Sequence, residues 1–391
     1  MAKEMKKLRR KGLEDWKLVR KVCRNRLLQE RYRTMKSRLA KMGEIEAFRM
    51  VKPLEGRSAI PPMQTPEGRT VFEFEKVSDM TAEQLEPGEE KDVVDERIEI
   101  SVTMEDLKAA IKASPSNTAG GIGKMSYPLL RFWMRKEGDK MLALVNEWVK
   151  GDCRDWHKVE TILIRKGNKS RYDVVKSWRM INLVSVMAKV VERVILRRIT
   201  EHVELEDTQY GSRKNRSTHD AFKQMLEFIE YSKGMKVGIV TMDVEGGFDK
   251  VAIDFLSTVL YQRGCPENLK KWTMRWACRR STRLRFHGKT SKVYYLNKGV
   301  PQGSPLSPFL FGAYVADVFR PRIQTRMNFR RMVSSYVDDG GILVATPTVE
   351  GTKEELAACL RECVEVAESR GMGFSSSEMD WIGFSEEDWG E

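Results

Sequence analysis

The stretch MVSSYVDDGGILVAT, residues 332–346, consists of two short apolar runs separated by a polar tip. Val, Ile and Leu in these runs favour strands, and the pair Asp339-Gly340 is typical of a hairpin turn. The carboxylates of Asp338 and Asp339 repel each other at this tip unless a cation binds between them. The stretch therefore predicts a β-hairpin whose tip is either a divalent metal site or an ordinary Asp-Gly turn.

A second carboxylate follows another apolar strand. The segment VGIVTMDVEGGFDKV (237–251) places Asp243 at the carboxyl end of that strand, before a glycine turn and a helix. Two hard cations about 3.5–4 Å apart need carboxylates from separate elements. Asp243 together with the hairpin aspartates therefore suits two-metal phosphoryl transfer. Asp249 and Asp254 fit helix-cap and surface positions.

The third notable segment is the loop KGVPQGSPLSP (298–308). Gly299 and Gly303 allow close backbone approach, and Gln302 and Ser304 offer hydrogen bonds before a helix that begins at Ser307-Pro308. The loop is either part of a binding site or a well-capped junction between a loop and a helix.

The rest of the chain mixes helices with strands. Helices are predicted at residues 126–150, 185–205 and 352–371, and a further helix follows the N-cap residue Thr103. Strands are predicted at 161–167 and on both sides of His287-Gly288. We expect an α+β fold in which an antiparallel sheet carries helices on one face.

Charge is distributed unevenly along the 391 residues. The net charge of +13 favours polyanionic partners over acidic small substrates. Residues 1–52 carry 18 Lys and Arg against 6 Asp and Glu, whereas residues 53–110 carry 6 against 15. We expect a basic helical N-terminal extension at 1–52 and, because prolines recur in it, an extended acidic connector at 53–102.

Cysteine usage and hydropathy exclude several other classes of protein. The six cysteines are scattered without a CxxC pair, so neither a disulfide framework nor a zinc site is indicated. The sequence has no apolar N-terminal segment and no run of about 18 apolar residues. It therefore predicts a soluble, intracellular protein with free thiols.

In this order, the segments DVEGGFD (243–249), GVPQGSPLSP (299–308) and YVDD (336–339) resemble the palm motifs of reverse transcriptases. Residues 176–199 and 209–221 are similar to finger motifs of the non-LTR (LINE-like) retrotransposon members, and similarity covers roughly residues 20–384. The resemblance implies a right-hand polymerase. Its fingers would lie at 103–235, and its palm at 236–391 would include a segment that returns to the fingers and a truncated or missing thumb.

The same resemblance implies an RNA-directed DNA polymerase that uses two Mg²⁺ ions, with Mn²⁺ as a substitute. Its partners would be an RNA template, a DNA primer and deoxynucleoside triphosphates, without a membrane, and it would reside in the nucleus. The implied catalytic residues are Asp243, Asp338 and Asp339. Val244 joins Asp243 and Asp338 as an implied metal position.

Five residues are implied at the nucleotide site. Phe248 falls at the position where a ring crowds a ribose 2′-OH, and Lys166 and Arg179 at positions that meet the triphosphate. Gln302 and Gly303 would shape the site for template and nucleotide. Judged from the residues alone, core packing for Phe248 and solvated surface charge for the two cations remain open alternatives.

Residues 270–289 combine Lys and Arg with Trp272, Trp276 and Phe286. Cations that neutralise phosphates and rings that stack on bases suit a template–primer surface. An amphipathic helix with its aromatic side chains in the core is the alternative. The residues expected to contact nucleic acid are Arg213, Arg216, Arg279 and Arg280.

Departures from the family pattern raise a second function hypothesis. Met180 stands where the family has Pro in its Arg-Pro-Ile segment, AGGIGK (119–124) replaces Pro-Gly-Asp-Gly, and Glu378 stands in place of a lysine. That lysine is thought to protonate the departing pyrophosphate, and loss of a general acid costs about 10²–10⁴ in rate. The alternative function is therefore a catalytically inactive nucleic-acid-binding protein that retains the palm fold, from a truncated or degenerate copy. An RNA-dependent RNA polymerase is disfavoured by Phe248.

Overall fold

The computed structural model divides the chain into two units, residues 1–60 and 61–391. The predicted basic helix at 1–52 lies outside the described residues. Among the residues described, no helix is both long enough and apolar enough to cross a membrane. The described residues are 63–384 except 72–73, 91–95, 116–120, 122–124, 152–157, 168–169, 279, 287–288, 321–323, 327–328 and 377–378.

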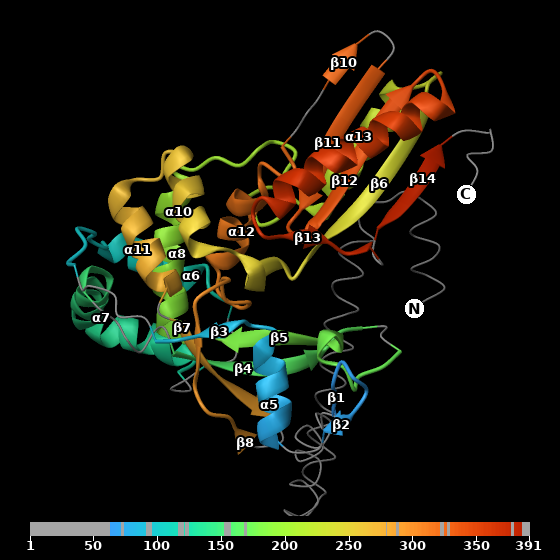
Figure 1. The fold of residues 1–391 in the computed structure, drawn as a ribbon. Coiled ribbons are helices and arrows are strands. Elements are labelled where there is room, and N and C mark those ends of the chain that lie inside the picture. Colours follow the sequence, from blue (N-terminus) through green and yellow to red (C-terminus); the bar gives the residue numbers. More distant parts are fainter. Residues whose placement is uncertain are drawn as a thin grey trace, which may run out of the picture. The chain divides into compact units, whose positions relative to one another are not determined.

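The predicted catalytic aspartates lie on an antiparallel sheet, which we call the aspartate sheet (Figure 1). Its strand order is β10-β11-β12-β6-β13, and β14 also pairs with β6. The β-hairpin expected from residues 332–346 is confirmed, because β11 and β12 pair up to a two-residue turn. The strands are β6 (Lys236–Glu245), β10 (Gln324–Arg326), β11 (Phe329–Tyr336), β12 (Asp339–Thr346), β13 (Gly373–Phe374) and β14 (Asp380–Phe384).

Helices cover both faces of the aspartate sheet, whereas we expected them on one face. Neighbouring residues of a strand point to opposite faces, so Ile239 and Val240 of β6 belong to different clusters. Ile239 packs with apolar side chains of α9 (Thr218–Tyr231). The Val240 face packs against α13 (Val349–Glu368), which lies across β6 and β12 (Figure 1). Burial on two sides explains the nearly continuous apolar runs of these central strands.

A second sheet, which we call the mixed sheet, has the order β3-β9-β7-β4-β5, with β8 paired to β7. Strands β4 and β7 run parallel, so the antiparallel arrangement expected from the sequence does not hold throughout this sheet. Strand β7 follows β6 in the chain and returns between β4 and β9. The strands are β3 (Pro87–Gly88), β4 (Lys158–Arg165), β5 (Trp178–Leu183), β7 (Arg280–Phe286), β8 (Lys289–Thr290) and β9 (Tyr294–Leu296).

Where the structure describes residues 63–88 of the acidic segment, they form short strands and a helix in place of the extended connector that the prolines predicted. The segment contains the hairpin β1 (Met63–Gln64) and β2 (Thr70–Val71), helix α5 (Phe74–Glu83) and strand β3. The hydroxyl of Tyr294 donates to Asp79 of α5 at 2.8 Å, and β3 pairs with β9 at the edge of the mixed sheet. Pro87 is tolerated because an edge strand need not donate every backbone hydrogen bond. Residues 63–88 are therefore packed structure.

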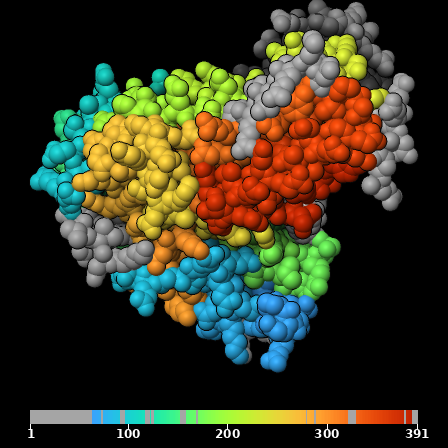
Figure 2. Space-filling view, turned by 45° about the horizontal axis from the view of Figure 1, so that its top comes forward, coloured from blue at the N-terminus to red at the C-terminus, as the bar shows by residue number. Residues whose placement is uncertain are grey.

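The remaining helices begin largely where the sequence predicts. Thr103 and Asp106 form the predicted capping box, and the helices expected at 126–150, 185–205 and 352–371 are confirmed as α7, α8 and α13. In Figure 2 the red C-terminal residues border the gold region, and the guanidinium of Arg370 lies over the ring of Phe255 in α10. The helices are α6 (Met104–Lys112), α7 (Tyr127–Lys150), α8 (Val186–Thr200), α10 (Ile253–Gln262), α11 (Glu267–Cys278) and α12 (Ser307–Val315), with short 3-10 turns η2 (Val175–Ser177) and η3 (Gly247–Lys250).

Candidate active site

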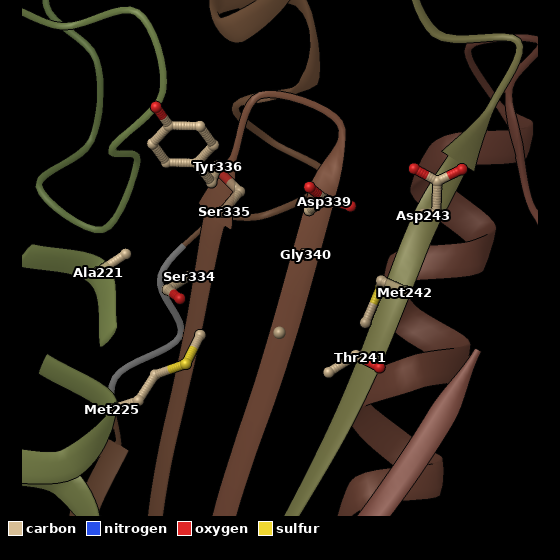
Figure 3. Close-up of a pocket in the computed structure, with 11 residues that line it drawn as sticks. Ala221, Met225, Thr241, Met242, Asp243, Ser334, Ser335, Tyr336, Asp339 and Gly340 are labelled. Atoms are coloured by element: carbon tan, nitrogen blue, oxygen red, sulfur yellow. The ribbon is translucent and has the colours of Figure 1, made fainter. Parts of the chain in front are cut away.

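The three predicted catalytic aspartates lie together at one end of the aspartate sheet. Asp243 of β6 is directly opposite Asp339 of β12 in the antiparallel register, and such partners have Cα atoms about 4.5–5.5 Å apart. The backbone N–H of Val244 donates to the carbonyl oxygen of Asp338 at 3.2 Å. Figure 3 shows the carboxylates of Asp243 and Asp339 on these neighbouring strands.

The third carboxylate faces the glycine turn that follows β6. A Cβ atom built on Gly247 would lie 4.0 Å from a carboxylate oxygen of Asp338. Gly246 adopts φ of 76°, the left-handed region that glycine enters at little cost. The turn after Asp243 therefore bends back beside Asp338.

The donors at this end of the sheet fit hard divalent cations. Mg²⁺ is commonly held by one or two protein carboxylates while substrate phosphates and water complete its coordination. Across the described part of the chain, no cluster of three or more Asp, Glu, His or Cys side chains encloses a metal position.

The hairpin tip is in contact with residues 210–211, which lie more than a hundred positions earlier in the chain. Val337 occupies the turn with φ of 63°, a strained conformation for a β-branched residue. The backbone N–H of Tyr210 donates to the carbonyl oxygen of Ser335 at 2.9 Å. A Cβ atom on Gly211 would lie 2.4 Å from the backbone nitrogen of Val337. Only glycine lets this segment pass so close to the turn.

A pocket of about 330 Å³ opens beside Asp243 and Asp339, between the sheet and α9 (Figure 3). The hydroxyl of Ser334 is buried on this side without a hydrogen-bond partner. Gly341 carries no side chain, so the space next to Met225 stays open. The pocket is lined by Ala221, Met225, Thr241, Met242, Asp243, Ser334, Ser335, Tyr336, Asp339, Gly340 and Gly341.

Phe248 lies just after the glycine turn and is partly buried. Its ring stacks on Phe311 of α12, with ring centroids 4.9 Å apart and an angle of 26° between the planes. The core therefore holds one side of the ring in place.

The loop that precedes α12 is pinned at Gln302 and Gly303. The backbone carbonyl of Gln302 accepts from the backbone N–H of Asn182 at 2.7 Å, and its side-chain amide donates to Asp249 at 3.3 Å. Gly303 has φ of 129°, and a Cβ atom there would lie 2.4 Å from the carbonyl oxygen of Asn182. The mixed sheet thus sets the position of this loop.

Asp249 is a residue of this region that the sequence interpretation placed at a cap or surface position. Burial raises the pKa of its carboxyl to about 6, although the charges of Arg280 and Lys166 oppose the rise. Its partners come from the mixed sheet and from the loop before α12, which sequence spacing does not reveal. The one sequence feature that could have pointed to Asp249 is its position directly after Phe248, at the end of the motif DVEGGFD (243–249).

Arg280 was expected to contact nucleic acid, but its side chain lies in the interior of the protein. It is 5% exposed, and its guanidinium donates to the backbone carbonyl oxygens of Ala277, Lys298 and Gly299. Burial lowers the pKa of Arg280 to about 10. Its donors serve the loop before α12 and are not presented to a nucleic-acid strand. Arg279 lies outside the described residues.

The two finger cations lie on the β4–β5 pair of the mixed sheet. Lys166 directly follows β4, and its charge acts on Asp249. Arg179 of β5 is exposed and pairs across the sheet with Ile164. The structure therefore brings Lys166 toward the aspartate sheet and leaves Arg179 open to solvent.

Arg213 and Arg216 brace the segment that runs beneath the hairpin tip. Arg213 donates to the backbone carbonyl oxygens of Glu206 and Gln209. Arg216 donates to Asp207 at 2.9 Å and lies over the ring of Tyr210. Their guanidinium groups remain partly exposed, so bracing and phosphate contact are compatible.

The tryptophans of the basic stretch belong to the core. Trp272 and Trp276 are 4% and 5% exposed, and the indole N–H of Trp276 donates to Glu192 at 3.0 Å. The alternative interpretation of an amphipathic helix therefore accounts for both rings. Glu378, the departure from the family pattern, lies outside the described residues.

Comparison with known proteins identifies the family. Residues 164–379 match the family described as reverse transcriptase (RNA-dependent DNA polymerase). Because the match spans more than half of the chain, this protein belongs to the reverse transcriptase family. The recognition of a reverse transcriptase domain of the non-LTR retrotransposon type is confirmed.

Several curated relatives are proteins of transposons and mobile elements. A probable RNA-directed DNA polymerase from transposon BS of Drosophila melanogaster is 24% identical over 86% of this chain and 36% of its own length. The RNA-directed DNA polymerase from mobile element jockey of the same species is 24% identical over 64% of this chain and 28% of its own length. A transposon TX1 protein of Xenopus laevis is 23% identical over 73% and 22%, respectively. The chain thus spans roughly a third or less of these relatives.

Proposed function

We propose that this chain is an RNA-directed DNA polymerase that joins deoxynucleotides to a DNA primer by two-metal nucleotidyl transfer. The observation that carries the proposal is the register of Asp243 opposite Asp339, with Asp338 in the adjoining turn. Strand ends bearing three acidic residues are unfavourable unless cations offset their repulsion. Reverse transcriptase family membership supports the same chemistry.

In the proposed reaction, the primer 3′-oxygen attacks the α-phosphorus of a deoxynucleoside triphosphate. A new phosphorus–oxygen bond forms, the bond to the bridging oxygen breaks, and pyrophosphate leaves. Two Mg²⁺ ions, when bound, would supply Lewis-acid activation and charge neutralisation. Asp243 and Asp338 would hold them, and Asp339 would add negative charge beside them.

The remaining site residues would orient the nucleotide. Lys166 and Arg179 would bind the triphosphate oxygens, since cations aimed at a departing phosphate stabilise its developing charge. Phe248, fixed by Phe311, would exclude a ribose 2′-OH. Gln302 and Gly303 would form the floor of the nucleotide site.

Primer extension tests the proposal. The chain should extend a DNA primer on an RNA template with Mg²⁺, and Asp338→Asn should lower the rate by about 10²–10³-fold, because the turn then offers fewer charged oxygens. Asp254→Asn, an exposed acid in the first turn of α10, is the matched control and should retain the wild-type rate. Absence of extension with both Mg²⁺ and Mn²⁺ would contradict the proposal.

The second candidate is an inactive nucleic-acid-binding protein with the same fold. Glu378 at the place of the expected lysine favours it. In that case primer–template binding would persist, synthesis would be absent, and Asp338→Asn would leave affinity unchanged. Measuring affinity and extension on the same preparations distinguishes the two functions.

A further inference from the structure

Glu192 of α8 is a buried carboxyl group that the proposed chemistry does not use. Its side chain is 2% exposed, and burial raises the pKa of this carboxyl. A buried carboxyl is tolerated only when hydrogen bonds replace those to water. The hydrogen-bond partners of Glu192 therefore show which elements this side chain holds together.

Two hydrogen bonds connect Glu192 to different elements. One carboxylate oxygen accepts from the hydroxyl of Ser304 at 2.7 Å. The other accepts from the indole N–H of Trp276 in α11 at 3.0 Å. Ser304 belongs to the loop at residues 298–306, directly after Gly303. A single side chain thus joins two helices to the loop that carries Gln302.

Ser304 extends this connection into the loop backbone. Its hydroxyl oxygen also accepts from the backbone N–H of Leu306 at 3.0 Å, so donating to Glu192 fixes the orientation of the hydroxyl. On the other side of Gly303, Asn182 holds the backbone carbonyl of Gln302. Loop residues 302 and 303 are therefore fixed from both ends, by α8 and by β5.

We propose that Glu192 is a positioning residue that holds loop 298–306, through Ser304, in the conformation that presents Gln302 and Gly303 to the nucleotide. The inference rests on the proposed function, because the loop matters only if a nucleotide binds there. Glu192 itself touches neither nucleotide nor metal. Its contribution is to restrict a glycine-containing loop that would otherwise sample several conformations.

Hydrogen exchange tests the positioning role without requiring activity. Glu192→Gln keeps the size of the side chain but leaves one acceptor oxygen for two donors. Either the indole N–H of Trp276 loses its acceptor, or the hydroxyl of Ser304 must turn from donating to accepting. We expect exchange of the backbone amides of Val300, Ser304 and Leu306 to accelerate about tenfold, while β6 and α13 remain protected. Glu201→Gln, at the exposed end of the same helix, is the matched control and should change nothing.

Nucleotide kinetics then connect the loop to the site. Glu192→Gln should raise KM for the deoxynucleotide about tenfold and change kcat less than threefold, because binding geometry is lost while the aspartates stay in place. Ser304→Ala should have the same effect, and the double variant should add little to either single change.

The outcomes separate the inference from the proposed function. Unchanged loop exchange in Glu192→Gln, or an equal rise across the whole chain, would overturn the inference even in an active enzyme. If the wild-type chain is inactive, but Glu192→Gln speeds exchange in the loop alone, the positioning role stands and the proposed polymerase function is refuted. Wild-type KM in an active Glu192→Gln enzyme would also overturn the inference.

Discussion

Asp249, in the short turn η3 after β6, interacts with charged residues of the mixed sheet. Its carboxyl accepts from Gln302, and Arg280 and Lys166 act on it from the mixed sheet. Asp249 and Arg280 are 31 positions apart in sequence, so no local pattern indicates that they interact. Sequence reasoning located Asp243, Asp338 and Asp339 because each lies at the end of an apolar strand, where a carboxylate is conspicuous. It missed Asp249 because only tertiary structure buries that residue.

The raised pKa of Asp249 predicts a pH dependence of stability. The pKa of the native carboxyl is about 6, whereas an Asp carboxyl in water titrates at about 3.8. Its stabilising contribution is therefore complete below about pH 3.8 and is lost as pH rises through 6. Relative to Asp249→Asn, the free energy of unfolding of the wild type should fall by about 3 kcal/mol between pH 4 and 7.

Urea denaturation at a series of pH values measures this difference. Because Asn does not titrate, the pH dependence of Asp249→Asn gives the contribution of all other groups, and subtracting it from that of the wild type isolates Asp249. If the difference in free energy of unfolding between the wild type and Asp249→Asn stays constant, or grows in favour of the wild type toward neutral pH, the carboxyl is already ionised at pH 4.

Phe248 predicts sugar selectivity. Phe248→Ala should raise the ratio of ribonucleotide to deoxynucleotide kcat/KM by about tenfold or more, because removing the ring opens space for a 2′-OH. Phe222→Ala, at an exposed position on α9, is the control. If selectivity is equal in the two variants, Phe248 is a core residue only.

At the level of elements, the strands were easier to predict than the helices that pack on them. The apolar runs of β6 and β12 identify both strands. The turn between β11 and β12 is Val337-Asp338, so the Asp339-Gly340 turn suggested by the sequence was placed two residues too late, and both residues lie in β12. The packing of α9 on the second face of the aspartate sheet could not be predicted, since period-two alternation is lost when both faces are buried. The packing of the acidic segment was missed because Pro66 lies in a turn and Pro87 in an edge strand, where proline is compatible with packed structure.

The contact between residues 209–211 and the hairpin tip predicts a steric effect. Gly211→Ala should lower polymerase activity at least about tenfold, because the new methyl group would overlap the backbone nitrogen of Val337 and displace the aspartates, and small displacements at a reacting site are costly. Gly373→Ala meets no atom within 4 Å and should be neutral. Steady-state primer extension compares the two variants, and equal activity would mean that the turn accommodates the methyl group.

For the whole molecule, the net charge of +13 predicts that nucleic-acid binding depends strongly on salt. Each neutralised phosphate releases counterions, so affinity for a primer–template should fall about 10³-fold between 50 and 200 mM salt if roughly six phosphates are contacted. Fluorescence anisotropy across a salt series measures the slope. Arg216→Gln should make the slope shallower by about one phosphate, whereas Arg280→Gln, inside the protein, should leave it unchanged. A slope near zero would contradict phosphate-driven binding.

The parallel pairing of β4 with β7 constrains the order in which the protein can be assembled. Strand β4 has one neighbour, β5, from its own half of the chain, and acquires the other only when residues 280–286 are available. During synthesis, the growing polypeptide exposes an unpaired strand edge until more than a hundred further residues have left the ribosome, and such edges promote aggregation. A gene fragment cut between the two halves would give a piece with that edge permanently bare.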